Sequence, residues 1–196
     1  MKNLCIALLL VTTTLSFAQK AKPKTATSSA LATFENLKAE IITEGGKQKL
    51  AIIIDNAGKK ENVILKDLTT KDKAQQPTNF KIKSFTVSGV KLYHFSYTEN
   101  IITETKLKKE NALVTSNEIW DLSATKLKIL GNIQTVTNIK EIKKLGKSEA
   151  TETVEKTRRE GFEFVLTKDF EVFLSTKTQT NKYKFNPTTR RYDPKK

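Results

Sequence analysis

The chain has 196 residues, and 35 lysines and arginines outweigh 21 aspartates and glutamates to give a formal net charge of +14. One cysteine and one histidine exclude a disulfide scaffold, a cysteine-based zinc site and a multi-histidine metal site within one chain. The hydrophobic content of 37% is too high for a wholly disordered chain, and the length corresponds to about one domain.

The first 18 residues have the three parts of a secretory signal peptide. A short basic start is followed by an apolar run from Leu4 to Val11, and the small residues Ser16 and Ala18 suit cleavage before Gln19. The apolar stretch is shorter than the ~20 residues that a transmembrane helix needs, so we expect no transmembrane segment. The sequence thus predicts a protein exported to the periplasm or beyond, and loss of Cys5 would leave the mature chain without cysteine.

A basic segment follows the predicted cleavage site. Residues 19–32 carry three lysines, one proline and a run of threonine, alanine and serine without apolar periodicity, which predicts a disordered tether. Residues 33–196 are expected to form a single β-rich domain.

Two hairpins are predicted from glycine-containing turns. Gly45-Gly46 separates two apolar runs, and a two-residue loop there places three apolar pairs on one face. The pairs expected across this hairpin are Glu44 with Lys47, Ile41 with Leu50, Ala39 with Ile52, and Leu37 with Ile54. A second hairpin, turning at Ser88-Gly89, is expected to pair Phe80 with Tyr97, Ile82 with Phe95, and Phe85 with Leu92.

The rest of the chain continues mostly with a period of two. Further strands are expected at 62–67, 101–108, 112–122, 126–130, 161–167, 170–175, 183–185 and 190–192, with Asn186-Pro187 as a turn. Residues 132–142 also fit a helix ending at Gly146, but their β-branched content favours a strand. The fold class predicted is all-β, an antiparallel sandwich or open barrel built from hairpins.

Residues 149–160 resist assignment. Glu152 with Lys156, and Glu155 with Arg159, have helical i,i+4 spacing, and Gly161 suits a helix C-cap. Threonine and valine in this segment weaken a helix, so we expect either a loop or one short helix here.

The chain lacks an evident catalytic group. His94 is expected to face Lys83 and its strand neighbour Ser96 to face Lys81, and nearby positive charge disfavours a charged imidazole. Carboxylate pairs such as Glu99/Glu104 or Glu118/Asp121 remain possible, but they have no spacing signature. We therefore predict no catalytic residue, no cofactor and no metal ligand.

The positive charge points to anionic partners such as envelope polysaccharide or lipid. Only four of the cationic residues are arginines, and base recognition favours arginine, so specific nucleic-acid binding is not expected. The candidate polyanion contacts are the densest basic residues: Lys140, Lys143, Lys144, Lys147, Arg190 and Arg191. An aromatic stripe of Tyr93, Phe95 and Tyr97 is a candidate ligand-binding surface, although a core face is the commoner explanation of such a stripe.

The sequence predicts a monomeric, exported, non-catalytic envelope binding or accessory module with weak affinity for polyanions. Two other functions stay open. One is a carboxylate-dependent glycan hydrolase, which needs two acids in a cleft. The other is a lipocalin-like carrier of a small apolar ligand, which needs a closed barrel with a cavity.

Overall fold

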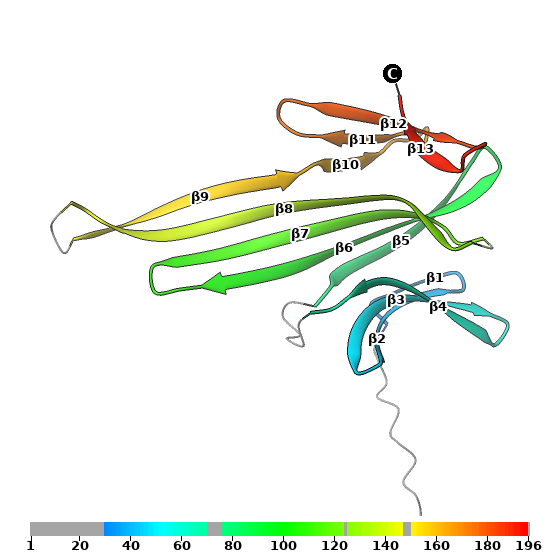
Figure 1. Ribbon diagram of the computed structural model, residues 1–196, viewed down its shortest axis with the longest axis horizontal. Coiled ribbons are helices and arrows are strands. Elements are labelled where there is room, and N and C mark those ends of the chain that lie inside the picture. Colours follow the sequence, from blue (N-terminus) through cyan, green and yellow to red (C-terminus); the bar gives the residue numbers. More distant parts are fainter. Residues whose placement is uncertain (1–29, 70–75, 124, 147–149, 196) are drawn as a thin grey trace, which may run out of the picture.

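The computed structural model describes residues 30–69, 76–123, 125–146 and 150–195. The predicted signal peptide, nearly all of the predicted tether and Lys147 lie outside the described residues. Within these ranges the chain forms three antiparallel sheets and no helix (Figure 1). The all-β prediction is confirmed, and the three sheets stack as layers of a sandwich.

Sheet A has the order β1 (Ala32–Phe34), β2 (Leu37–Glu44), β3 (Lys47–Asn56) and β4 (Lys59–Asp67). The register predicted for the β2–β3 hairpin is confirmed at all four pairs, from Glu44 with Lys47 to Leu37 with Ile54. Gly45 and Gly46 have φ angles of 58° and 77°, a left-handed conformation that glycine adopts at little cost.

Sheet B is the central layer, and its strands are long. It contains β5 (Thr78–Val87), β6 (Val90–Glu104), β7 (Lys108–Asp121), β8 (Leu127–Lys144) and β9 (Thr151–Gly161). The predicted pairs Ile82 with Phe95 and Phe85 with Leu92 are confirmed. The ladder shifts register before Lys81, so Phe80 has no direct partner in it, although its ring stacks on that of Tyr97 at 5.3 Å.

Two predicted elements of sheet B are wrong. The strand predicted at 101–108 is interrupted by a turn, in which Thr105 N donates to Lys108 O and Lys108 N donates to Thr105 Oγ1. The hydroxyl of Thr105 stabilises this turn, and the turn contains neither glycine nor proline. The sequence therefore has no residue here that is typical of a turn.

The segment 149–160, expected as a loop or short helix, instead contributes strand β9. Every residue from Thr151 to Gly161 pairs with β8. The charges that have helical spacing bond across strands instead, Glu155 to Lys140 at 2.7 Å and Lys156 to Glu141 at 3.2 Å. The strand preference for 132–142 is confirmed, because these residues lie within β8.

Sheet C follows after Gly161. It contains β10 (Glu163–Leu166), β11 (Val172–Ser175), β12 (Thr180–Asn186) and β13 (Arg191–Pro194). The turn predicted at Asn186-Pro187 is present, and Asn186 Oδ1 accepts a hydrogen bond from Thr188 N.

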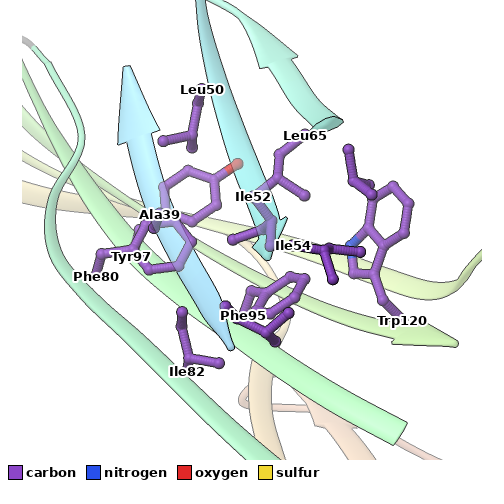
Figure 2. Close-up of a cluster of buried hydrophobic side chains, with 12 residues drawn as sticks. Ala39, Leu50, Ile52, Ile54, Leu65, Phe80, Ile82, Phe95, Tyr97 and Trp120 are labelled. Atoms are coloured by element: carbon purple, nitrogen blue, oxygen red, sulfur yellow. The ribbon is translucent and has the colours of Figure 1, made fainter. Parts of the chain in front are cut away.

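Two hydrophobic cores lie on opposite faces of sheet B. The first joins Leu50, Ile52 and Val63 of sheet A to Phe95 and other side chains of sheet B (Figure 2). The second joins sheet C to the other face of sheet B, and its buried members are Phe85, Leu92, Ile119, Val172, Phe185 and Tyr192. Alternation along each strand explains this division, because successive side chains point to opposite faces.

Ion pairs link the sheets at the edges of both cores. Lys66 of β4 pairs with Glu99 of β6, and Glu61 of β4 pairs with Lys126 just before β8. Glu35, in the turn between β1 and β2, pairs with Lys91 of β6. On the other face, Arg190 before β13 pairs with Asp121 at the end of β7. Each sheet is therefore tied to sheet B by charge as well as by apolar packing.

Sheet B extends beyond both covering sheets as a distal arm, which comprises residues 100–112, 136–146 and 150–158 (Figure 1). Ile101 is 42% and Ile102 43% accessible to solvent here, whereas Ile139 is buried at 4%. The arm places part of sheet B in solvent on both faces.

Candidate functional site

An open groove of about 840 Å³ lies where sheet C meets strands β8 and β9 of sheet B. One wall belongs to β8 and β9, and the other belongs to the start of sheet C and the β11–β12 turn. The lining residues are Gln134, Thr157, Arg159, Gly161, Glu163, Ser175, Thr176, Lys177 and Thr178. The lining is thus made of hydroxyl, amide and charged side chains.

Gly161 forms the corner at which the chain leaves sheet B for sheet C. Its φ is +77°, and a Cβ at this position would lie 2.2 Å from the carbonyl oxygen of Ile133. The next residue is held by a hydrogen bond from Asn132 Nδ2 to Phe162 O at 2.9 Å. This close approach fixes where sheet C starts and hence the width of the groove.

The β11–β12 turn is closed by its own first residue. Thr176 Oγ1 accepts hydrogen bonds from the backbone N–H groups of Thr178 and Gln179, and Thr176 N donates to Gln179 O at 2.8 Å. These bonds define the backbone from which Lys177 projects.

His94 is not part of the groove lining and lies in the layer between sheets B and C. It faces Lys83, and Ser96 faces Lys81, as predicted. Its Nε2 is 3.1 Å from Asn117 Oδ1, and its ring stacks on Phe164 with centroids 5.0 Å apart. Burial lowers the pKa of His94, the Asn117 hydrogen bond opposes this, and Lys83 lowers the pKa further. Burial and the nearby lysine favour the neutral form of His94, and the stacked ring and the amide oxygen give it a structural role between the sheets.

We expect the stability of the protein to fall as pH decreases below about 6.5, the usual histidine pKa. The folded-state pKa of His94 is below that value, so the unfolded chain takes up the proton more readily and acid favours unfolding. The free energy of unfolding, measured from pH 7 to pH 5, should lose this slope in His94→Gln. An equal slope in both proteins would contradict the assignment, since the chain has one histidine.

The aromatic stripe is part of the first core. Phe95 and Tyr97 are 0% and 2% exposed, Tyr93 is partly buried, and sheet A side chains pack against them (Figure 2). Burial raises the pKa of Tyr97 to about 12, so its phenol stays neutral at physiological pH. Sheet A covers this face of the stripe, so these rings form a core face, the commoner of the two explanations that the sequence allowed.

The predicted polyanion contacts do not form one patch. Lys140, Lys143 and Lys144 are exposed near the end of the distal arm, whereas Arg190 and Arg191 lie just before and at the start of β13, at the opposite end of the molecule (Figure 1). Lys140 pairs with Glu155, and Arg190 pairs with Asp121 and also donates to Ser123 Oγ at 3.2 Å. Arg190 therefore has a structural partner, while Arg191 stays exposed.

Arg190→Ala is expected to lower the free energy of unfolding by about 2 kcal/mol, because it leaves a buried carboxylate without its cation. The Asp121 side chain is only 3% exposed, but Arg190 is 47% exposed, so water can replace part of the interaction. Urea unfolding of Arg191→Ala provides the matched control, for which we expect a change within about 0.5 kcal/mol. Equal effects of the two substitutions would show that the pair does not contribute.

The carboxylates that the hydrolase hypothesis would need are held by other partners. Glu118 accepts a hydrogen bond from Trp120 Nε1 at 2.7 Å and pairs with Lys128, and Glu99 pairs with Lys66 at 2.6 Å. Asp121 is bound to Arg190, and Glu104 is paired with Lys109 in the distal arm. These acids stabilise contacts within and between the sheets.

Sequence reasoning missed the groove. Its lining comes from separate strands and a turn, and only the pairing of β8 with β9 and the crossing to sheet C bring these residues together. The one residue whose type hints at a change of direction is Gly161, but in the sequence alone it fits a helix cap equally well.

Some features of other protein classes are absent from the described ranges. In this part of the chain, no helix has the length and apolar character needed to cross a membrane. Nor do these residues gather three or more histidine, cysteine or acidic side chains into a group that could hold a metal ion. Comparisons of the chain with protein-family models, with curated proteins and with solved structures find no match in any of the three.

Proposed function

We propose that the protein is an exported, non-catalytic binding module with electrostatic affinity for acidic polysaccharide of the cell envelope. The observation that carries this proposal is the net charge of +14 on a chain of 196 residues. A surface with such an excess of one sign attracts polymers of the opposite sign and raises their local concentration.

The arrangement of the charges supports weak rather than specific binding. Many acidic side chains already have a cation beside them, Glu99, Glu141 and Glu171 among them, so the excess is carried by lysines exposed to solvent. Lysine presents a flexible point charge without the planar fork of arginine, and it suits contact with a polymer of variable geometry.

Binding to acidic polysaccharide can be measured on the mature chain, residues 19–196, with polygalacturonate as the probe. We expect binding at low ionic strength that weakens as salt approaches about 0.15 M, where charges are screened beyond about 8 Å. No binding at low salt, or binding that salt does not weaken, would overturn the proposal. Tighter binding to vesicles of anionic phospholipid than to polysaccharide would overturn the choice of ligand.

Export is tested separately by expressing the full chain in a Gram-negative host. The proposal requires the protein outside the cytoplasm with Gln19 as its first residue, which N-terminal sequencing shows. Retention of Met1 in a cytoplasmic protein would contradict it.

A further inference from the structure

The groove between strands β8 and β9 and sheet C carries positive charge on both walls. Arg159 comes from β9, and Lys177 comes from the β11–β12 turn. Among the described residues, neither has a carboxylate within 4.0 Å, whereas the neighbouring Arg158 pairs with Glu160. Both cations are therefore available to an anionic group that enters the groove.

The remaining lining suits a ligand with many hydroxyl groups. Gln134 supplies an amide, while Thr157, Ser175, Thr176 and Thr178 supply hydroxyls, and both groups donate as well as accept hydrogen bonds. A sugar ring carries hydroxyls of the same dual character on its edges, so it can satisfy several of these groups at once. The volume of about 840 Å³ falls within the roughly 300–1,000 Å³ usual for small-ligand sites.

The lining also argues against other anionic ligands. It contains no aromatic side chain on which a nucleic-acid base would stack, and no large apolar side chain that would hold an acyl chain. The one acidic lining residue, Glu163, can accept hydrogen bonds from sugar hydroxyls, but it repels a second anionic group nearby.

We propose that this groove is a binding site for an acidic saccharide, with its carboxylate or phosphate between Arg159 and Lys177 and its hydroxyls on the threonine, serine and glutamine side chains. The inference rests on the proposed function, and it identifies the groove as the place where specific binding of the saccharide occurs. Glu163 makes the site selective for sparsely charged saccharides over densely sulfated ones.

The test compares two double variants of the mature chain that lose the same charge. Arg159→Gln/Lys177→Gln removes both groove cations, and Lys47→Gln/Lys60→Gln removes two exposed lysines of sheet A, on the other side of sheet B. Calorimetry measures binding of a short galacturonate oligomer, a phosphorylated oligosaccharide and a neutral galactose oligomer of equal length. Unfolding curves of both variants establish that they are folded.

We expect the groove variant to bind the acidic oligomers at least roughly tenfold more weakly than wild type, because it loses two charge-assisted hydrogen bonds to the anionic group. The sheet A variant should lose less than about threefold, since only screened long-range attraction is removed. Binding of either acidic oligomer with this pattern supports the site, and the tighter of the two identifies the anionic group. Glu163→Gln should raise the affinity for densely sulfated dextran relative to wild type.

Failure of the inference is distinguishable from failure of the proposed function. Equal losses in both double variants would overturn the groove as the site while leaving electrostatic binding of polysaccharide intact. A neutral oligomer that binds as tightly as the acidic ones would overturn the role of the two cations. Wild-type protein that binds no acidic polymer at low salt would overturn both proposals.

Discussion

Replacement of Phe95 by alanine is expected to lower the free energy of unfolding by about 3–5 kcal/mol, the range for removing a fully buried phenylalanine. The Phe95 ring is 0% exposed in the middle of the first core. Its centroid lies 6.2 Å from that of Phe80 and 6.5 Å from that of Trp120 (Figure 2). Because these neighbours are held in separate strands, they cannot collapse fully into the space that the substitution leaves.

Trp120 is the only tryptophan and lies in the same core, so its fluorescence reports urea unfolding of this region directly. The matched control is Ile133→Ala, since Ile133 lies in the same sheet but is 62% exposed. We expect the control to change the free energy of unfolding by less than about 1 kcal/mol. Similar losses in the two variants would mean that Phe95 is not at the centre of a packed core.

Replacement of Gly161 by alanine is expected to cost about 3 kcal/mol, because a left-handed alanine is strained by about 1–2 kcal/mol and its Cβ must also displace backbone. The atom it would meet at 2.2 Å is the carbonyl oxygen of Ile133, which belongs to β8 and cannot rotate away as a side chain would. The substitution should also widen the junction of β9 and sheet C, and so weaken any ligand bound in the groove.

Gly131→Ala is the control for this prediction. Gly131 also lies in β8, but its φ is not positive, and the nearest atom to an added Cβ is the flexible Lys128 Cδ at 3.6 Å. Alanine is compatible with that conformation, so stability should change little or rise by up to about 1 kcal/mol. Denaturation curves that place the two alanine variants at the same stability would contradict the geometry described at Gly161.

Features set by local pairing could be predicted from the sequence. At Gly45-Gly46 the turn residues fix a two-residue loop, and only one register places Leu37, Ala39 and Ile41 opposite apolar partners. The same reasoning predicts that His94 faces Lys83 across the second hairpin, and this pairing is confirmed. In both hairpins the partners near the turn are close in sequence, so the alternation of side chains predicts them, but it does not predict the register shift that removes the Phe80–Tyr97 pair.

Features that depend on a strand or sheet outside the segment itself could not be predicted in this way. The charges of β9 fit helical spacing as well as they fit cross-strand pairs with β8, and only the presence of β8 decides between the two. Likewise, nothing local to Tyr93, Phe95 and Tyr97 shows that sheet A covers their face of the strand. The groove depends on Gly161 and the turn at Thr176, which are adjacent only because sheet C folds back on sheet B.

The order of strands within each sheet follows the order along the chain, from β1 to β4, from β5 to β9 and from β10 to β13. Each strand pairs with the strand next to it in the sequence, so the entropy lost on closing the loop between them is small at each step. Such local connectivity favours rapid folding for an all-β protein, whose kinetics are ordinarily slowed by pairing between remote strands. Each sheet can therefore form strand by strand, starting from its own turns. The slow step that remains in folding is the packing of the three formed sheets against one another.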